Sequence, residues 1–210
     1  MNITVLGATG MVGRRVTTEA LGRGHRLVAV ARTPPRAAPG LTPLAVDVAD
    51  PAAPGAAMSG ADVAVLAVRP APGAEATLSA LTRSVLDAAQ RTGTRVLVVG
   101  GAGPLRCPAD PDRLLVDDPT YVPEQWRTLA AASVAQLREC QAHPGADWTY
   151  LSPPAVLEPG ERTGRYRRGT DTALADRAGV SRVSAEDLAV AVLDELERPG
   201  ADRWFTVADC

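Results

Sequence analysis

The sequence predicts an α/β fold built on a doubly wound parallel sheet. Short, nearly continuous apolar runs recur along the 210 residues, as expected of strands that are buried on both faces. Patterns with helical spacing lie between these runs, so successive strands should be joined by right-handed crossovers. A glycine cluster at the first strand-to-helix turn fits the same arrangement.

Seven apolar runs are predicted as strands of this sheet. They are short and rich in valine, leucine and alanine, and most end at a glycine, a proline or a charged residue. They lie at residues 2–6, 26–31, 42–48, 62–68, 95–100, 147–152 and 204–209.

Four segments show the apolar spacing of amphipathic helices. The first, 11–21, follows the first strand directly, and the second covers 75–91. The third runs through 126–137 after a proline suited to a first helical turn, and the fourth through 188–196. Ser184 precedes the fourth helix with an acid three residues on, which is close to a capping box.

Length and composition indicate one soluble domain over residues 1–210. The chain is 46% hydrophobic and 22% charged, and its formal net charge of −2 gives no reason to expect a nucleic-acid partner. No run approaches the ~20 apolar residues that span a bilayer, and no signal peptide pattern opens the chain. We therefore expect a cytoplasmic protein without a membrane partner.

Cysteine and histidine are too few for a disulfide framework or a metal site. Cys107, Cys140 and Cys210 are far apart, odd in number and without CxxC spacing, which indicates reduced thiols. His25 and His143 are the only histidines. We therefore expect no zinc site and no other bound metal.

The glycine cluster "GATGMVG" has the position of a dinucleotide-binding turn. Gly7 permits the turn out of the strand, Gly10 lets the backbone approach a pyrophosphate, and Gly13 lets the helix pack closely on the sheet. Backbone amides from Thr9 to Val12, including that of Met11, would then meet the anion at the positive end of the helix. The alternative is a turn that only shortens the connection.

The end of the second strand favours NADP(H) over NAD(H). An acid there usually binds the ribose hydroxyls of NAD, whereas an arginine accommodates the 2′-phosphate of NADP. In this chain Ala31 takes the acid's place, and Arg32 and Thr33 follow it. Arg36 could share the phosphate, and the alternative is that Arg32 is a solvated loop residue.

The next two strands end in further candidates for cofactor contact. Asp47 could accept a hydrogen bond from the adenine amino group while Val48 covers the ring; a helix-capping Asp47 is the alternative. After the fourth strand, Ala67, Val68 and Arg69 should run beneath the nicotinamide ribose.

Two segments interrupt the alternation of strands and helices. Residues 101–123 leave the carboxyl end of a predicted strand, where open α/β sheets bind their ligands, and connections this long are more often functional than accidental. Residues 157–173 are polar and follow the sixth strand. We expect these two segments to form the walls of a small substrate pocket.

Five segments carry a resemblance to a known family: "GATGMVG", "VAVARTP", "VLVVGGAG", "DWTYLSPPAVLEPGERTGRY" and "SRVSAEDLAVAVLDELE". Through them, nearly the whole chain resembles the atypical short-chain dehydrogenase/reductase superfamily. The resemblance is to its small NmrA-like and NADH-flavin-reductase-like members. It implies a Rossmann fold, a substrate pocket over the nicotinamide, and Gly100 and Pro153 near that ring. It also implies an NADP(H) site at Gly7, Thr9, Gly10, Met11, Val12 and Arg32.

The usual acid–base residues of the superfamily are missing. Its typical members carry a YxxxK pair, in which the lysine lowers the pKa of the tyrosine. Here the corresponding helix has no lysine, and Pro104 stands where related small members often have serine. Tyr121 is the nearest remnant and the candidate proton donor, although Pro123 places it just before the helix; Asp117 and Asp118 could also supply an acid, but adjacent acids before a proline are more typical of a solvated turn. With a pKa near 10, Tyr121 would donate a hydrogen bond rather than act as a base.

These observations favour an NADPH-dependent reductase of a small electron-poor acceptor, such as a flavin, a quinone or an enone. Such acceptors need little help from a protein proton donor. One alternative is a biosynthetic tailoring enzyme, a reductase, isomerase or cyclase, acting on one metabolite; another is a non-catalytic NADP(H) sensor. We expect a small-molecule substrate and a monomer or homodimer.

Overall fold

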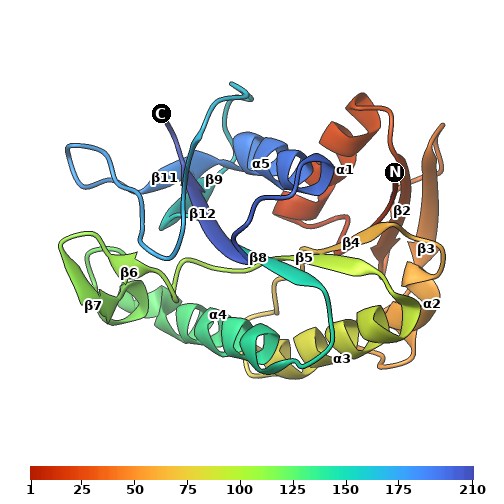
Figure 1. Ribbon diagram of the computed structural model, residues 1–210, viewed down its shortest axis with the longest axis horizontal. Helices are drawn as coiled ribbons and strands as arrows, with labels where there is room; N and C mark the ends of the chain where they lie inside the picture. The colour runs from red at the N-terminus through yellow and green to blue at the C-terminus, as the bar shows by residue number, and fades with distance from the viewer.

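The computed structural model describes all residues, 1–210, and is organised around an eight-stranded sheet (Figure 1). All neighbouring strands are parallel except the pair at one edge, which is antiparallel. The order is β10 (Arg167–Gly169), β12 (Trp204–Ala208), β8 (Trp148–Ser152), β5 (Arg95–Val99), β4 (Val63–Leu66), β1 (Asn2–Leu6), β2 (Arg26–Ala31) and β3 (Leu41–Ala45). The predicted doubly wound α/β fold is therefore confirmed.

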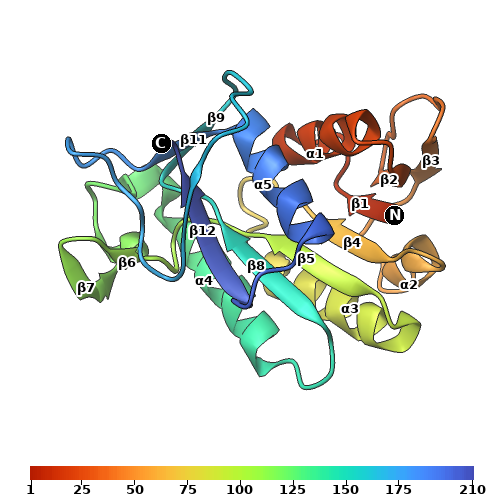
Figure 2. The same ribbon diagram turned by 45° about the horizontal axis from the view of Figure 1, so that its top comes forward.

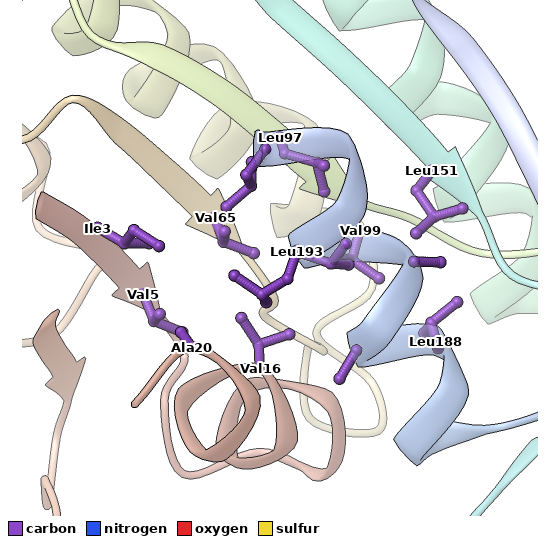
Figure 3. Packing of buried hydrophobic residues seen from close by; sticks show 14 of the residues in the cluster. Ile3, Val5, Val16, Ala20, Val65, Leu97, Val99, Leu151, Leu188 and Leu193 are labelled. Carbon is purple, nitrogen blue, oxygen red and sulfur yellow. The ribbon is translucent and has the colours of Figure 1, made fainter. Parts of the chain in front are cut away.

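Helices cover both faces of the sheet. On one face lie α1 (Met11–Gly22) and α5 (Ala185–Glu197), and on the other α2 (Ala53–Met58), α3 (Thr77–Thr92) and α4 (Glu124–Ala142) (Figures 1 and 2). Figure 3 shows the first face, where Val16 of α1 and Leu193 of α5 point toward Val65 of the sheet. Each face buries its own apolar cluster, as a two-sided parallel sheet requires.

All seven predicted strands are present, with some changes at their ends. The third was predicted at 42–48 and runs over Leu41–Ala45, and the fourth was predicted at 62–68 and runs over Val63–Leu66. In both cases the extra apolar residues have already left the sheet for the loop that follows. The predicted strands were therefore too long, because apolar residues continue into the loops that follow them.

Several short elements were not predicted from the sequence. Helix α2 has only six residues, APGAAM, which is too short for a helical period. The two interrupting segments contain a hairpin of β6 (Arg106–Cys107) and β7 (Asp110–Leu114), a 3-10 helix at Leu115–Asp117, and β9 (Val156–Glu158), which pairs with β11 (Arg182–Ser184). Their sequences are polar or mixed because most of these residues are not buried on two sides.

The segments 101–123 and 157–173 meet beyond the end of the sheet at which β5 and β8 finish (Figures 1 and 2). Arg106 joins them: its Nε lies 2.9 Å from Asp171 Oδ2, and its backbone amide donates to the Asp171 carbonyl. The Ala173 amide donates in turn to the Arg106 carbonyl. The two segments predicted to wall one pocket are therefore neighbours at the carboxyl edge.

An ionic network holds part of the second segment onto the helices. Glu19 of α1 accepts hydrogen bonds from Arg162 at 2.7 Å and from Arg23 at 2.9 Å, and Arg23 also reaches Asp194 of α5. Tyr166 donates to the same Asp194 at 2.8 Å. The side chains of Arg162 and Tyr166 are thus bound to residues of α1 and α5.

This network makes the stability of the folded protein depend on pH. The hydrogen bond from Arg162, opposed by burial and assisted by Arg23, lowers the pKa of Glu19 to about 2. Because the folded pKa lies below the ordinary value of 4.5, the stabilisation is complete above about pH 4.5 and is lost as the pH falls toward 2. We predict that Glu19→Gln lowers the unfolding free energy at pH 7 and flattens its decline between pH 5 and about 2, measured by urea denaturation. An unchanged decline would contradict the assignment.

Candidate functional site

The turn between β1 and α1 is pressed against the end of β4. Gly7 has a φ of +92°, and a Cβ added there would lie 2.5 Å from the Ala67 carbonyl oxygen. The amides of Gly7 and Ala8 both donate to the Val30 carbonyl, at 2.9 and 3.0 Å. Three neighbouring strands, β1, β2 and β4, therefore fix the path of this turn, and only glycine fits its first position.

Gly13 and Gly10 differ in what surrounds them. A Cβ at Gly13 would overlap the Gly7 carbonyl, so this glycine is what lets α1 approach the sheet. Gly10 is exposed, has φ −68° and ψ 170°, and a Cβ there would meet only the Gly7 oxygen at 3.3 Å and the Ala67 oxygen at 3.7 Å. A small shift relieves the first of these contacts. The fold itself therefore requires Gly13 far more than Gly10.

The N-terminus of α1 is open to an anion. Gly10 is its N-cap residue, no side chain caps the helix, and its first turn contains no acid. The amide of exposed Thr9 donates no hydrogen bond within the protein. Free amides at the positive end of the helix, beside a glycine with room above it, suit the pyrophosphate of a dinucleotide. The residues from Thr9 to Val12 thus fit the group that the sequence predicts.

At the end of β2 the structure leaves cationic side chains free. Ala31 is buried as the last strand residue, and Arg32 and Thr33 are exposed beyond it. Neither Arg32 nor Arg36 forms an ion pair. A guanidinium without a carboxylate partner is available to a phosphate.

The residues after β3 are placed differently from one another. Asp47 Oδ1 accepts the Ala49 amide at 3.0 Å, which closes a local turn. The alternative of a helix-capping Asp47 is wrong, because α2 begins after Ala52, which has no side-chain cap. Val48 is 7% exposed and belongs to the core beneath α2 and α3. Any ring it covers would therefore meet only a small part of its side chain.

Of the three residues after β4, two lie at the glycine turn and the third, Arg69, extends toward α4. Ala67 and Val68 line the glycine turn, since both would contact a Cβ on Gly7. Arg69 is exposed and reaches toward α4, where its guanidinium carbon lies 4.9 Å from the centre of the Trp126 ring. The main chain at 67–68 therefore lies at the turn, while the Arg69 side chain leads away from it.

Gly100 and Pro153 are the residues that directly follow the neighbouring strands β5 and β8. The Gly100 amide donates to the Leu151 carbonyl at 2.9 Å, and a Cβ on Gly100 would overlap the side chain of Tyr150. Pro153 follows β8 and is buried. The need for glycine at position 100 thus comes from the buried tyrosine on the neighbouring strand.

Two further glycines of "GGAG" were not predicted to matter. A Cβ on Gly101 would meet the Ser133 side chain at 2.9 Å, and a Cβ on Gly103 would overlap the Ala130 carbonyl of α4. These glycines seat α4 against the loop after β5. The sequence shows both the repeated glycines and the helix at 126–137, but it does not show that the two are in contact.

Tyr121 lies just before α4, as Pro123 predicted, and not inside the helix. It packs with Cys107, Leu115 and their neighbours in a small cluster under the β6–β7 hairpin. Burial, followed by the nearby Cys107 and Asp118 groups, raises its pKa above the usual value. The chain contains no lysine at any position that could lower it again. At neutral pH Tyr121 is therefore a hydrogen-bond donor and not a base.

No three histidine, cysteine or acidic side chains gather in a way that could hold a metal ion. No helix is both long and apolar enough to cross a membrane. The three cysteines are free thiols, two of them buried.

Comparison with known proteins finds a family match over most of the chain and a relative of nearly the same length. A family model described as NAD(P)H-binding matches residues 7–199. The uncharacterized protein YwnB of Bacillus subtilis is 34% identical over 202 residues, covering 95% of this chain and 93% of the relative.

Solved structures agree with this match. A Burkholderia pseudomallei structure, provisionally named as an exported protein, has a TM-score of 0.89 at 37% identity over 99% of both chains. A Streptococcus pneumoniae structure, provisionally named as an NADH-flavin reductase, has a TM-score of 0.85 at 26% identity over 100% of both chains.

The contrast between Gly10 and Gly13 predicts a separation of binding from folding. Gly13→Ala should lower the melting temperature strongly, because backbone atoms must move to admit the methyl group. Gly10→Ala should leave the melting temperature within a few degrees and weaken dinucleotide binding, because its methyl group would face the pyrophosphate. Thermal denaturation and calorimetric titration with NADPH measure both. Unchanged NADPH affinity in a folded Gly10→Ala protein would contradict the placement of the site.

Proposed function

Because the chain belongs to the NAD(P)H-binding family, we propose that it is an NADPH-dependent reductase of a small electron-poor acceptor, such as a flavin, a quinone or an enone. The observation that carries the proposal is the uncapped start of α1 beside an open Gly10. That turn has the geometry to hold a pyrophosphate at the carboxyl edge of the sheet, next to the ends of β4 and β5.

The choice of NADPH over NADH rests on Arg32. It follows β2 without an acidic residue at the strand end and without an ion-pair partner, and Thr33 beside it offers a hydroxyl. A 2′-phosphate would gain a charge-assisted hydrogen bond from the guanidinium, whereas the bare ribose of NADH would not. Arg36 is a second exposed cation on the same loop.

The chain's own residues supply position rather than acid–base chemistry. The β1–α1 turn holds the dinucleotide, and half-buried Gly100 and buried Pro153, after β5 and β8, border the space for the acceptor. When bound, NADPH supplies a hydride, which carries two electrons to the acceptor. The acceptor then takes one proton from water, and the products are NADP⁺ and the two-electron-reduced acceptor.

The lack of a proton donor with a lowered pKa favours acceptors that can be reduced without one. Tyr121 keeps a raised pKa and there is no lysine in the chain, so a fast proton relay of the Tyr-Lys type is absent from these residues. Reduced flavins and quinones can take their protons from water. The name of the 26%-identical Streptococcus pneumoniae neighbour supports the same acceptor class.

We propose a small molecule as the substrate and a monomer or homodimer as the working form, without a nucleic-acid or membrane partner. A cytoplasmic location fits three free thiols and the absence of any disulfide. Substrate-pocket walls are assigned to 101–123 and 157–173, which Arg106 and Asp171 hold together at the carboxyl edge.

The first prediction of this proposal concerns cofactor choice. Arg32→Ala should weaken NADPH binding about 10- to 100-fold, the worth of a hydrogen bond to a charged group, and should change NADH binding much less. Arg138→Ala, which removes an exposed and unpaired arginine of α4, serves as the matched control. Calorimetric titration measures both cofactors. Parallel losses for NADPH and NADH would contradict the role of Arg32.

The second prediction concerns turnover. The protein should oxidise NADPH, followed at 340 nm, on addition of a flavin or a quinone, and Tyr121→Phe should retain most of the rate. A loss of about 100-fold or more would instead make Tyr121 a general acid. NADPH binding without turnover of any acceptor would favour a sensor. Redox-neutral conversion of a metabolite would favour an isomerase or cyclase.

A further inference from the structure

We infer that Trp126 and Arg69 form the surface on which the acceptor binds, and that this pair selects planar aromatic acceptors bearing a negative charge. The inference deepens the proposed function and rests on it for the location of the reacting space. It assigns Arg69 to the acceptor and not to the nicotinamide ribose, where the sequence had placed it.

Trp126 stands out among the few aromatic residues because it is the only exposed one. Tyr150 and Phe205 are fully buried, and Trp148 is 6% exposed. Trp204 donates its indole N–H to Ser152, and Tyr166 donates to Asp194. Trp126, in contrast, is 48% exposed and its indole N–H forms no hydrogen bond within the protein. It is therefore the aromatic side chain best placed to stack on a ligand ring.

The position of the pair connects it to the candidate cofactor site. Trp126 lies in the first turn of α4, three residues after Pro123, and α4 begins near the β6–β7 hairpin at the carboxyl edge (Figure 2). Arg69 comes two residues after Ala67, whose carbonyl abuts Gly7 in the dinucleotide turn. The Arg69 side chain points away from the turn toward α4, but only Val68 separates Arg69 from Ala67 along the chain, so a ligand on this pair would bind at the same edge of the sheet as the dinucleotide.

Charge gives the pair its selectivity. Arg69 is exposed and forms no ion pair, and its guanidinium lies over the Trp126 ring at 4.9 Å from the ring centre. By contrast, the neighbouring Arg127 is paired with Asp117 at 3.6 Å. An unpaired cation held at an exposed aromatic ring suits a ligand that combines a flat ring system with a phosphate or carboxylate. Flavin mononucleotide has both parts, and riboflavin has the ring alone.

The test uses equilibrium binding to the NADP⁺-loaded protein, which holds an oxidised cofactor and so cannot reduce the flavin. Calorimetry compares flavin mononucleotide with riboflavin for the wild type, Trp126→Ala, Trp126→Phe, Arg69→Gln and the control Arg138→Ala. Stacking of a ring on an aromatic side chain is worth about 1–3 kcal/mol, or roughly 5- to 150-fold in affinity.

We expect Trp126→Ala to weaken both flavins by such a factor, and Trp126→Phe to restore most of the loss. Arg69→Gln should weaken flavin mononucleotide about 10-fold or more, leave riboflavin nearly unchanged, and keep the affinity for NADP⁺. Added salt should reduce the preference for flavin mononucleotide in the wild type and not in Arg69→Gln.

Three results would overturn the inference: no flavin binding by the wild type, equal binding by folded Trp126→Ala, or an Arg69→Gln protein that loses NADP⁺ affinity while its preference between the flavins is unchanged. A separate measurement, the consumption of NADPH, tests the proposed reductase activity. Flavin binding through Trp126 without turnover would sink the reductase alone, and turnover that ignores Trp126 would sink the acceptor surface alone.

Discussion

The close approach of α1 to the ends of β1 and β4 is the constraint on which the rest of the site depends. Gly7 leaves no room for a Cβ beside Ala67, and Gly13 leaves none beside Gly7, so the backbone of three elements meets without intervening side chains. This contact sets the start of α1 at the carboxyl edge, with its free amides directed outward. Gly10, which the packing barely needs, then lies where a ligand can come close. Gly7 and Gly13 thus allow the close packing of α1 on the sheet, and Gly10 leaves space for a ligand at the start of the helix.

Much of the fold could be predicted from the sequence because a parallel sheet buried on two faces has a strong apolar signal. Strands β1 and β2 begin and end at the predicted residues, and Ser184 caps α5 by accepting the Asp187 amide. The failures are also physical. Helix α2 is too short to show a period, and β6, β7, β9, β10 and β11 have only two to five residues each, most of them exposed or half-buried, so they show no clear apolar pattern.

The candidate site was predictable only where local sequence spacing marks it. The glycine turn and the cation after β2 follow from local spacing, so Gly7, Gly10 and Arg32 could be named in advance. The contact between Arg69 and Trp126 joins residues 57 positions apart and leaves no local pattern. The same holds for Gly100, whose neighbour is the Tyr150 ring, and for Asp47, whose carboxylate closes its own turn. Side-chain partners across the sheet depend on tertiary packing, which a single sequence does not display.

The central claim is that the β1–α1 turn holds NADP(H), with Arg32 on the 2′-phosphate. A crystal structure of the protein with NADP⁺ tests it most directly. The claim predicts the pyrophosphate within hydrogen-bond distance of the amides between Thr9 and Val12, the 2′-phosphate beside Arg32, and the nicotinamide toward Gly100 and Pro153. A cofactor bound elsewhere, or a 2′-phosphate directed into solvent away from Arg32, would contradict it.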